Sequence, residues 1–249
     1  MVRIPPAVLR FAGLFAVVVA WFAIAPHLPA WSMWPDVVLV AFVVMPATLL
    51  LVYLALPLWR RRWMPAACVA LALAAFAFSE LGWPLPENFA KLFAAAAAGW
   101  SFLVLFEQLS WVVLVAILVP FVDAISVWRG PTHDITAHHI HVYTSVSIAF
   151  LVPHGGAAYL GPPDVLFYAL FLAAAARWGL RPGWTWIATT FMYGLTVVIA
   201  TAADVGGLPA LPFLSFGFLA ANADLIWTRL RGPGSSSSPG RSRSRTPRT

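Results

Sequence analysis

The sequence predicts an all-α polytopic membrane protein, and three observations lead to this prediction. Hydrophobic residues make up 61% of the 249 positions, charged residues make up only 10%, and the mean hydropathy is +0.85. Soluble globular domains rarely have such a composition. In addition, several apolar runs have the roughly 20 residues that a helix needs to cross the hydrocarbon core of a bilayer. Lipid is therefore expected to be the main solvent of this chain.

Eight apolar runs between charged or Pro/Gly-rich breaks are candidate membrane-crossing helices. The first run has a second interpretation as a cleaved signal peptide, with Arg3 and Arg10 as basic residues and Ala23-Ile-Ala25 as a cleavage site. The seven spans that follow favour a helix that is retained. The eight runs lie at about 6 to 25, 35 to 58, 64 to 82, 88 to 106, 109 to 128, 160 to 178, 184 to 203 and 208 to 229.

The chain divides into two membrane regions and a tail. Residues 1–106 contain about four spans, and residues 107–230 contain the remaining spans together with the acids discussed below. Residues 231–249 hold five arginines, no acid and many serines, so we expect a disordered tail that accounts for most of the net charge of +6. Because no aromatic side chains that stack on bases are interleaved with these arginines, nucleic-acid binding is not expected.

The arginines predict the orientation in the membrane. With eight spans, nearly all of them fall on one side, leaving only Lys91 and Arg129 on the other. Cytoplasmic ends carry the Lys/Arg excess, so both termini are expected in the cytoplasm and the loop from Arg129 to Tyr159 outside. The cationic residues on the first side are Arg3, Arg10, Arg60, Arg61, Arg62, Arg177, Arg181, Arg229 and those of the tail.

Four of the acids in or near the spans are candidates for a function, because a carboxylate inside the membrane costs at least a few kcal/mol. Asp204 and Asp224 are close enough to span ends to reach headgroups or water. Asp123 lies about one and a half turns inside its span and should need a partner or a wet cavity. Asp164 follows two prolines, so its helix should begin near Pro162 with Asp164 in the first turn.

Two segments are expected to interrupt regular helix near these acids. The approach to Asp164, from His154 to Gly161, should be irregular backbone, which membranes tolerate only against protein or a water-filled cavity. The last span begins with Leu208-Pro-Ala-Leu-Pro-Phe-Leu214, whose two prolines predict a broken, hydrated helix start.

Three short motifs in the C-terminal half carry a family resemblance. They are Asp123-Ala-Ile-Ser-Val-Trp128, Leu160-Gly-Pro-Pro-Asp-Val165 and Pro209-Ala-Leu211. In order and spacing they resemble the Tyr-Asp, Gly-x-Gly-Asp and Pro-Ala-Leu signatures of the presenilin and signal peptide peptidase family of intramembrane aspartyl proteases. The resemblance covers residues 109 to 229 and implies a presenilin-like fold, which in that family has nine spans where this chain has eight candidates.

The resemblance implies an aspartic endopeptidase with Asp123 and Asp164 as the catalytic pair. Its substrates would be transmembrane helices or remnant signal peptides, and the setting would be a prokaryotic cell membrane. Two positions depart from the family, since Val122 replaces the tyrosine of the first motif and Pro163 the second glycine of the second. The residues implied to bind substrate or shape the active site are Gly161, Pro162, Pro163, Pro209, Ala210 and Leu211.

The chemistry of two neighbouring carboxyl groups supports the same mechanism independently. Two carboxylates a few ångströms apart share one proton, so one can activate water while the other polarises the scissile carbonyl. This chemistry requires no metal or other cofactor. Residues 142 to 152 are rich in β-formers, and we expect part of this loop, or the approach from Gly155 to Gly161, to pair with an unwound substrate as an added strand. An interfacial or re-entrant segment is the alternative for this loop.

Three other functions compete with proteolysis. Intramembrane acids and proline-broken helices also build proton or cation transporters and channels, although no inverted repeat is visible. A catalytically inactive relative that only binds helices is a second alternative, prompted by Pro163. A cluster formed by His133, Asp134, His138, His139 and His141 has spacing suited to zinc or copper, although a titratable interfacial loop is favoured. The oligomeric state is not indicated.

Overall fold

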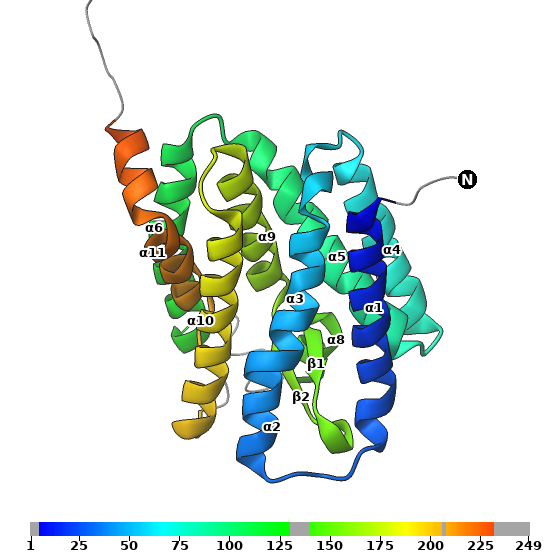
Figure 1. The fold of residues 1–249 in the computed structure, drawn as a ribbon. Helices are drawn as coiled ribbons and strands as arrows, with labels where there is room; N and C mark the ends of the chain where they lie inside the picture. Colours follow the sequence, from blue (N-terminus) through cyan, green and yellow to red (C-terminus); the bar gives the residue numbers. More distant parts are fainter. Residues whose placement is uncertain (1–4, 130–139, 206–207, 232–249) are drawn as a thin grey trace, which may run out of the picture.

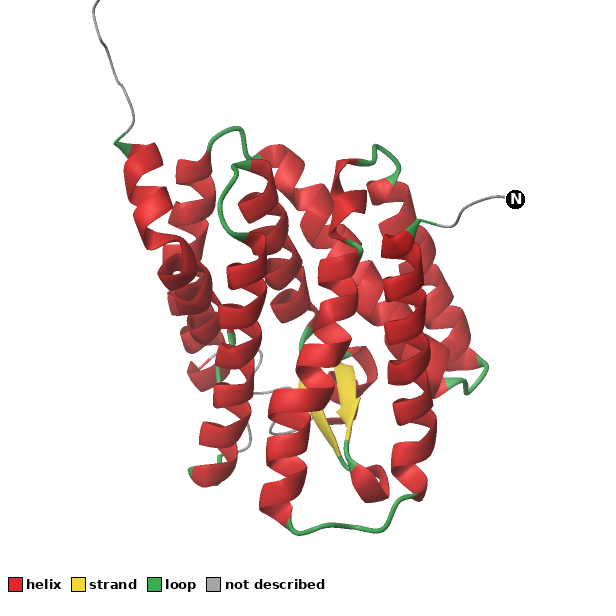
Figure 2. Ribbon diagram, in the orientation of Figure 1, coloured by secondary structure: helices red, strands yellow, loops and turns green. Residues whose placement is uncertain are grey.

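The computed structural model describes residues 5–129, 140–205 and 208–231, apart from the side chains of 127–129 and 140–142. Within these ranges the chain is a bundle of long helices that run up and down beside one another, with one small β-hairpin enclosed among them (Figures 1 and 2). The histidine cluster from His133 to His141 lies outside the residues whose side chains are described. The fold thus confirms the expected helical class.

The N-terminal half forms four helical crossings of the bundle. The second crossing is continuous but changes pitch, because a π-helical segment, η2, joins α2 to α3. Helices α1, α4 and α5 begin with proline in the first turn, where its missing N–H has no intrahelical partner to lose. The elements are α1 Pro6–Ile24, η1 Ala25–His27, α2 Met33–Leu39, η2 Val40–Val44, α3 Met45–Leu54, η3 Leu56–Arg60, α4 Met64–Glu80, α5 Pro84–Phe102 and η4 Leu103–Leu105.

The C-terminal half contains the candidate acids, with the hairpin between their helices. Four long helices belong to this half, and the last of them, α11, starts only after the Pro-Ala dipeptide at residues 209–210. The elements are α6 Leu109–Arg129, α8 Ile140–Val146, β1 Ile148–Leu151, η5 Pro153–Gly155, β2 Ala157–Leu160, α9 Pro162–Arg177, α10 Pro182–Ala202 and α11 Leu211–Leu230.

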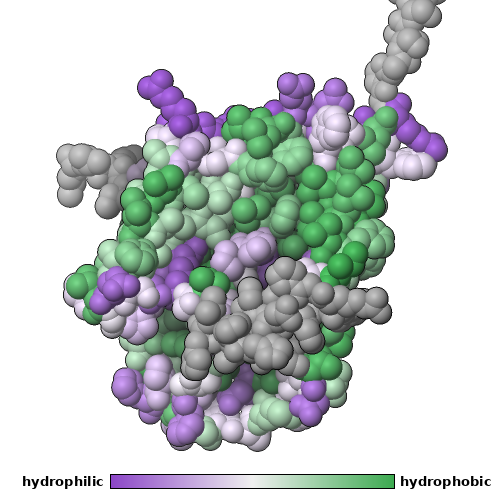
Figure 3. All heavy atoms as spheres, turned by 180° about the vertical axis from the view of Figure 1, so that it is seen from behind, coloured by the Kyte–Doolittle hydropathy of each residue, from purple (hydrophilic) through white to green (hydrophobic). Residues whose placement is uncertain are grey.

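Six helical segments among the described residues are long and apolar enough to cross a membrane. Two of the predicted spans are shorter as helices, because α4 ends at Glu80 and α9 covers only Pro162–Arg177. The outer surface agrees with a lipid environment: Figure 3 shows broad apolar areas, with hydrophilic side chains gathered toward the two ends and in a smaller patch between them. The chain is therefore a membrane protein with several spanning helices.

Helix α9 forms the centre of the core. Its residues from Tyr168 to Ala175 are 0% exposed, and it packs closely against α5. Close approach is possible because Gly99 of α5 faces the backbone of Leu166, leaving no space for a Cβ atom. On another side, the ring of Phe171 stacks on Phe218 of α11 with a centroid distance of 4.6 Å. Small and aromatic side chains thus fix α9 between its neighbours.

The hairpin corrects one expectation about the approach to Asp164. The segment from His154 to Gly161 was expected to be irregular, but Ala157–Leu160 form strand β2, which pairs antiparallel with β1. The pairing places Ile148 opposite Leu160 and Leu151 opposite Ala157. The β-rich loop contains strand β1, which pairs here with β2, and its first part folds as helix α8. The expected pairing with a substrate stays a prediction. Strand pairing satisfies backbone groups that an irregular segment would leave open in the membrane.

Helix α1 is integrated into the fold, which bears on the signal-peptide interpretation. Trp21 donates its indole N–H to the carbonyl of Leu151 at 3.0 Å, and the carbonyl of Leu28 accepts from the N–H of His154 at 3.2 Å. Val18 and Phe22 are buried against the core. These contacts favour a retained helix. Figure 1 also shows that α1 begins and α11 ends at the same end of the molecule.

Candidate active site

Asp164 lies in the first turn of α9, as the prolines predicted. Pro162 and Pro163 occupy the first two helical positions, where a backbone N–H would have no acceptor within the helix. The Asp164 carboxylate instead accepts the N–H of Gly161 at 3.0 Å, and the N–H of Asp164 donates to the Gly161 carbonyl at 3.1 Å. Pro163 therefore fits the start of this helix without losing a hydrogen bond, and the half-buried carboxylate is held beside Gly161.

Asp123 is held by the third motif. It lies on α6, is half-buried, and its Oδ2 accepts the backbone N–H of Leu211 at 3.0 Å. Leu211 is the first residue of α11, so its N–H is one of those without an intrahelical acceptor and lies at the positive end of the helix. The partner that a carboxylate inside a span requires is thus a helix N-terminus.

The Pro-Ala-Leu segment has the broken start that its prolines predicted. Residues 208–210 precede the helix without helical structure, and Pro209, Ala210 and Leu211 are all buried. The Leu211 N–H is free to reach Asp123 because the regular helix begins only at Leu211. Two motifs that are 88 residues apart in the sequence therefore meet directly.

The helices that carry the two acids contact each other. Helix α6, with Asp123, contacts α9, with Asp164, and also contacts α11. Among the hydrogen bonds of the described residues, none joins the two carboxyl groups directly. Each carboxylate instead accepts one backbone N–H, which leaves further acceptor positions on both.

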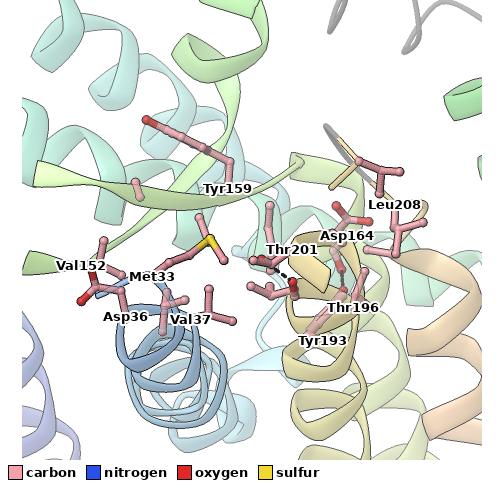
Figure 4. Close-up of a pocket in the computed structure, with 18 of the residues that line it drawn as sticks. Met33, Asp36, Val37, Val152, Tyr159, Asp164, Tyr193, Thr196, Thr201 and Leu208 are labelled. Carbon is pink, nitrogen blue, oxygen red and sulfur yellow. Dashed lines mark hydrogen bonds between the residues drawn. The ribbon is translucent and has the colours of Figure 1, made fainter. Parts of the chain in front are cut away.

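A cavity of about 600 Å³ extends from Asp164 along strand β2. Its walls come from α2, α8, α10, the strand and Ala210, so it reaches both the second and the third motif. Figure 4 shows Asp164, Tyr193 and Thr196 on one side of this cavity, with Met33, Asp36 and Val152 on the other and Tyr159 above. The cavity is long enough to connect the hairpin with the candidate acid.

Strand β2 presents its unpaired edge in this region. The N–H of Val152 donates to the carbonyl of Gly156 at 2.9 Å, and the alternation from that pair directs the N–H and C=O groups of Ala157 and Tyr159 away from β1. Within the described part of the chain, these groups make no hydrogen bond. Both residues line the cavity, which gives it an open strand edge near Asp164.

Tyrosines near Asp164 were missed by sequence reasoning. The hydroxyl of Tyr193 on α10 donates to the Asp164 backbone carbonyl at 2.7 Å. Tyr143 of α8 lines the same cavity; burial raises the pKa of its phenol, and the Asp164 carboxylate raises it further, so it stays protonated at neutral pH. Asp36 also lines the cavity, and its Oδ1 is buried with no hydrogen-bond partner among the described residues. A tyrosine within an apolar span was the available signal for Tyr193.

Val122, which stands where the family has tyrosine, faces away from the acids. Its side chain is 66% exposed on the outer surface of α6. A phenol at this position would also face outward in this arrangement. The phenols near Asp164 come from α8 and α10 instead.

The other two acids lie where their position near span ends predicted. Asp224 forms a two-pronged ion pair with Arg181, with oxygen to nitrogen distances of 2.8 and 2.7 Å, and its side chain is 60% exposed. Asp204 is exposed just beyond the end of α10, at the edge of the cavity. Neither Asp204 nor Asp224 takes part in the hydrogen bonds that hold Asp123 and Asp164.

The candidate site therefore consists of two acids from α6 and α9, the entry to α11, and a cavity bordered by β2. The three sequence motifs and the contacts among the described residues point to this candidate site. Comparisons with family models, with curated proteins and with solved structures found no match to this chain.

Proposed function

We propose that this chain is an intramembrane aspartyl protease of the presenilin and signal peptide peptidase type, with Asp123 and Asp164 as its catalytic pair. The observation that carries the proposal is the hydrogen bond from the N–H of Leu211, the first residue of α11, to Asp123. Ala210, directly before this helix, borders the cavity that reaches Asp164. All three motifs thereby contribute to one place. The contact between α6 and α9 brings the helices of the two acids together, as a proton-sharing pair requires.

The proposed mechanism uses the two carboxyl groups and one water. The ionised carboxylate takes a proton from the water as its oxygen attacks the scissile carbonyl carbon, while the protonated partner gives its proton to the carbonyl oxygen. When the C–N bond breaks, the leaving nitrogen takes up the proton held by the first carboxyl group, and one hydroxyl group of the tetrahedral intermediate returns its proton to the second carboxylate as the carbonyl re-forms. Water and peptide supply all the atoms, so neither metal nor cofactor enters the reaction.

The substrate would reach the acids as an extended segment added to β2. A peptide bond inside a helix is shielded by its own hydrogen bonds, so the substrate must unwind before attack. The outward N–H and C=O groups of Ala157 and Tyr159 offer it new partners along the cavity. Gly161, Pro162 and Pro163 follow the strand directly and would lie beside the segment to be cut.

Membrane topology is a further part of the proposal. The eight apolar runs would each cross the bilayer, including the shorter helices α4 and α9. Because the arginines gather at one end, both termini would be cytoplasmic, which suits substrates with a cytoplasmic N-terminus such as remnant signal peptides. A reporter fused after Thr249 tests this orientation; an external C-terminus would contradict it.

Cleavage in liposomes provides the main test of the proposal. The purified protein is reconstituted with a single-span peptide substrate, and products are identified by mass spectrometry. The variants Asp123→Asn and Asp164→Asn should each reduce cleavage to background, a loss of at least about a thousandfold, because each removes one half of the acid/base pair.

Asp224→Asn is the matched control, because it changes an exposed acid whose ion-pair partner among the described residues is Arg181. It should keep cleavage within about twofold of wild type. Persisting cleavage in either active-site variant contradicts the proposal. A wild-type protein that binds the peptide without cutting it indicates an inactive relative. One that moves protons across the vesicle wall, detected with a dye inside, indicates a transporter.

A further inference from the structure

The two edges of the hairpin differ in their surroundings. The carboxamide of Asn88 on α5 donates its Nδ2 to the carbonyl of Ala149 at 3.0 Å and accepts the N–H of the same residue at 2.7 Å. Two residues further along β1, the carbonyl of Leu151 accepts from Trp21 of α1 at 3.0 Å. The outer edge of β1 is therefore occupied by side chains, whereas the outer edge of β2 borders the cavity.

Asn88 takes the place of a neighbouring strand. Its carboxamide carries both a donor and an acceptor, so it satisfies an outward-facing strand residue as a peptide group would. The side chain is only 8% exposed, so loss of these bonds would leave two buried polar groups of Ala149 unpaired. A strand that approached β1 would meet no free N–H or C=O group at Ala149.

Neighbouring residues on α5 reinforce the same contact. Lys91 lies about one turn beyond Asn88, donates to the backbone carbonyl of Ser145, and pairs with Glu87 at 2.5 Å. These residues connect the first turns of α5 to the chain just before β1. The hairpin is thus anchored on its β1 side to a helix that packs firmly against α9.

We infer that Asn88 is a positioning residue that fixes where the substrate is cut, by closing β1 and holding β2 so that one register leads into the catalytic pair. The inference rests on the proposed proteolytic function. With Asn88 in place, a substrate strand has a single open edge to join, next to Asp164. Without it, the hairpin can shift on α5, and neighbouring registers of the substrate compete.

The test compares cleavage products of Asn88→Ala with those of wild type in liposomes containing one single-span peptide. Wild type should yield one main cut. In the variant, products displaced by one strand repeat, about two residues, should appear, and kcat/KM should fall about tenfold because two hydrogen bonds are lost. Asn88→Asp keeps the acceptor for the Ala149 N–H at the same size, so it provides a second variant if Asn88→Ala does not fold, and it should give an intermediate product pattern.

Asn222→Ala is the matched control, since Asn222 is also a buried asparagine, and its carboxamide donates to Thr185 and Phe218 away from the hairpin. It should lower thermal stability while leaving the ratio of products unchanged. Unchanged product ratios in both Asn88 variants, with wild type active, would overturn the inference alone. An intact wild-type protein that cuts nothing would instead reject the proposed function.

Discussion

The helices that carry the two candidate acids are packed in opposite ways. In α9, eight consecutive residues from Tyr168 to Ala175 are 0% exposed. In the second half of α6, Phe121, Val122 and Ile125 are 64%, 66% and 65% exposed. Asp164 therefore belongs to a helix enclosed by protein, whereas Asp123 belongs to one that faces lipid over much of its surface.

This difference assigns different parts to the two acids. The Asp164 carboxylate accepts the N–H of Gly161, and its backbone carbonyl accepts the hydroxyl of Tyr193. Among the described residues, the Asp123 carboxylate is held by the N–H of Leu211 at the start of α11. Helix α6 also contains Pro120 one turn before Asp123, which interrupts its hydrogen-bond ladder. If the distance between the carboxyl groups of Asp123 and Asp164 changes, we expect α6 and α11 to move rather than α9.

The largest loss of stability is expected from Gly99→Ala, which tests the close packing of α9 against α5. The added methyl group would collide with the backbone at Leu166, which no rotation of a side chain can relieve. We expect a loss of more than about 3 kcal/mol in unfolding free energy. Gly13→Ala on α1, where nothing lies within 4 Å of the new Cβ atom, should be neutral or slightly stabilising. Thermal unfolding in detergent measures both; equal stabilities would contradict the tight α5–α9 packing.

Phenylalanine truncations compare the two acid-bearing helices directly. Phe171→Ala on α9 removes a 0% exposed ring stacked on Phe218 and should cost about 3 kcal/mol. Phe121→Ala on α6 removes a ring that is 64% exposed and should cost less than about 0.5 kcal/mol. Chemical denaturation in mixed micelles gives the two values. Similar losses would mean that α6 is packed as firmly as α9.

A smaller effect is expected from the hydroxyl that supports Asp164. Tyr193→Phe removes the hydrogen bond to the Asp164 carbonyl and should cost about 1 kcal/mol of stability together with an about tenfold loss of cleavage. Tyr168→Phe removes a comparable buried bond, to Leu49 at 3.1 Å, and should cost similar stability with cleavage within about twofold. Equal losses of cleavage would show that Tyr193 acts through stability alone.

Local features of the sequence predicted the helix starts that create the site. Proline fixes φ and removes a donor, so Pro162-Pro163 placed Asp164 in a first turn, and Pro209 predicted the delayed start of α11 at Leu211. Apolar length also predicted the approximate positions of six long spans, since lipid imposes one simple requirement on each segment, whereas the helices α4 and α9 are shorter than the predicted runs.

Contacts between distant segments could not be predicted in this way. Asn88 binds Ala149, which is 61 positions away in the sequence, and Tyr193 binds Asp164, which is 29 positions away. The residues around each position give no local signal of these contacts. The pairing of Ala157–Leu160 with β1 was not predicted, because the glycines and alanines from Gly155 to Ala158 resemble a loop, whereas the partner strand decides their conformation. Tertiary partners, rather than propensity, determined these features.

The closed edge of β1 also sets a stoichiometry. A hairpin with two accessible edges could hold two guests at once, but here Asn88 and Trp21 occupy one of them. Each copy of the protein should therefore be saturated by a single peptide. Any two extended peptides should therefore compete for the edge of β2. In the proposed proteolysis, the cleaved product should leave this edge before the next substrate binds.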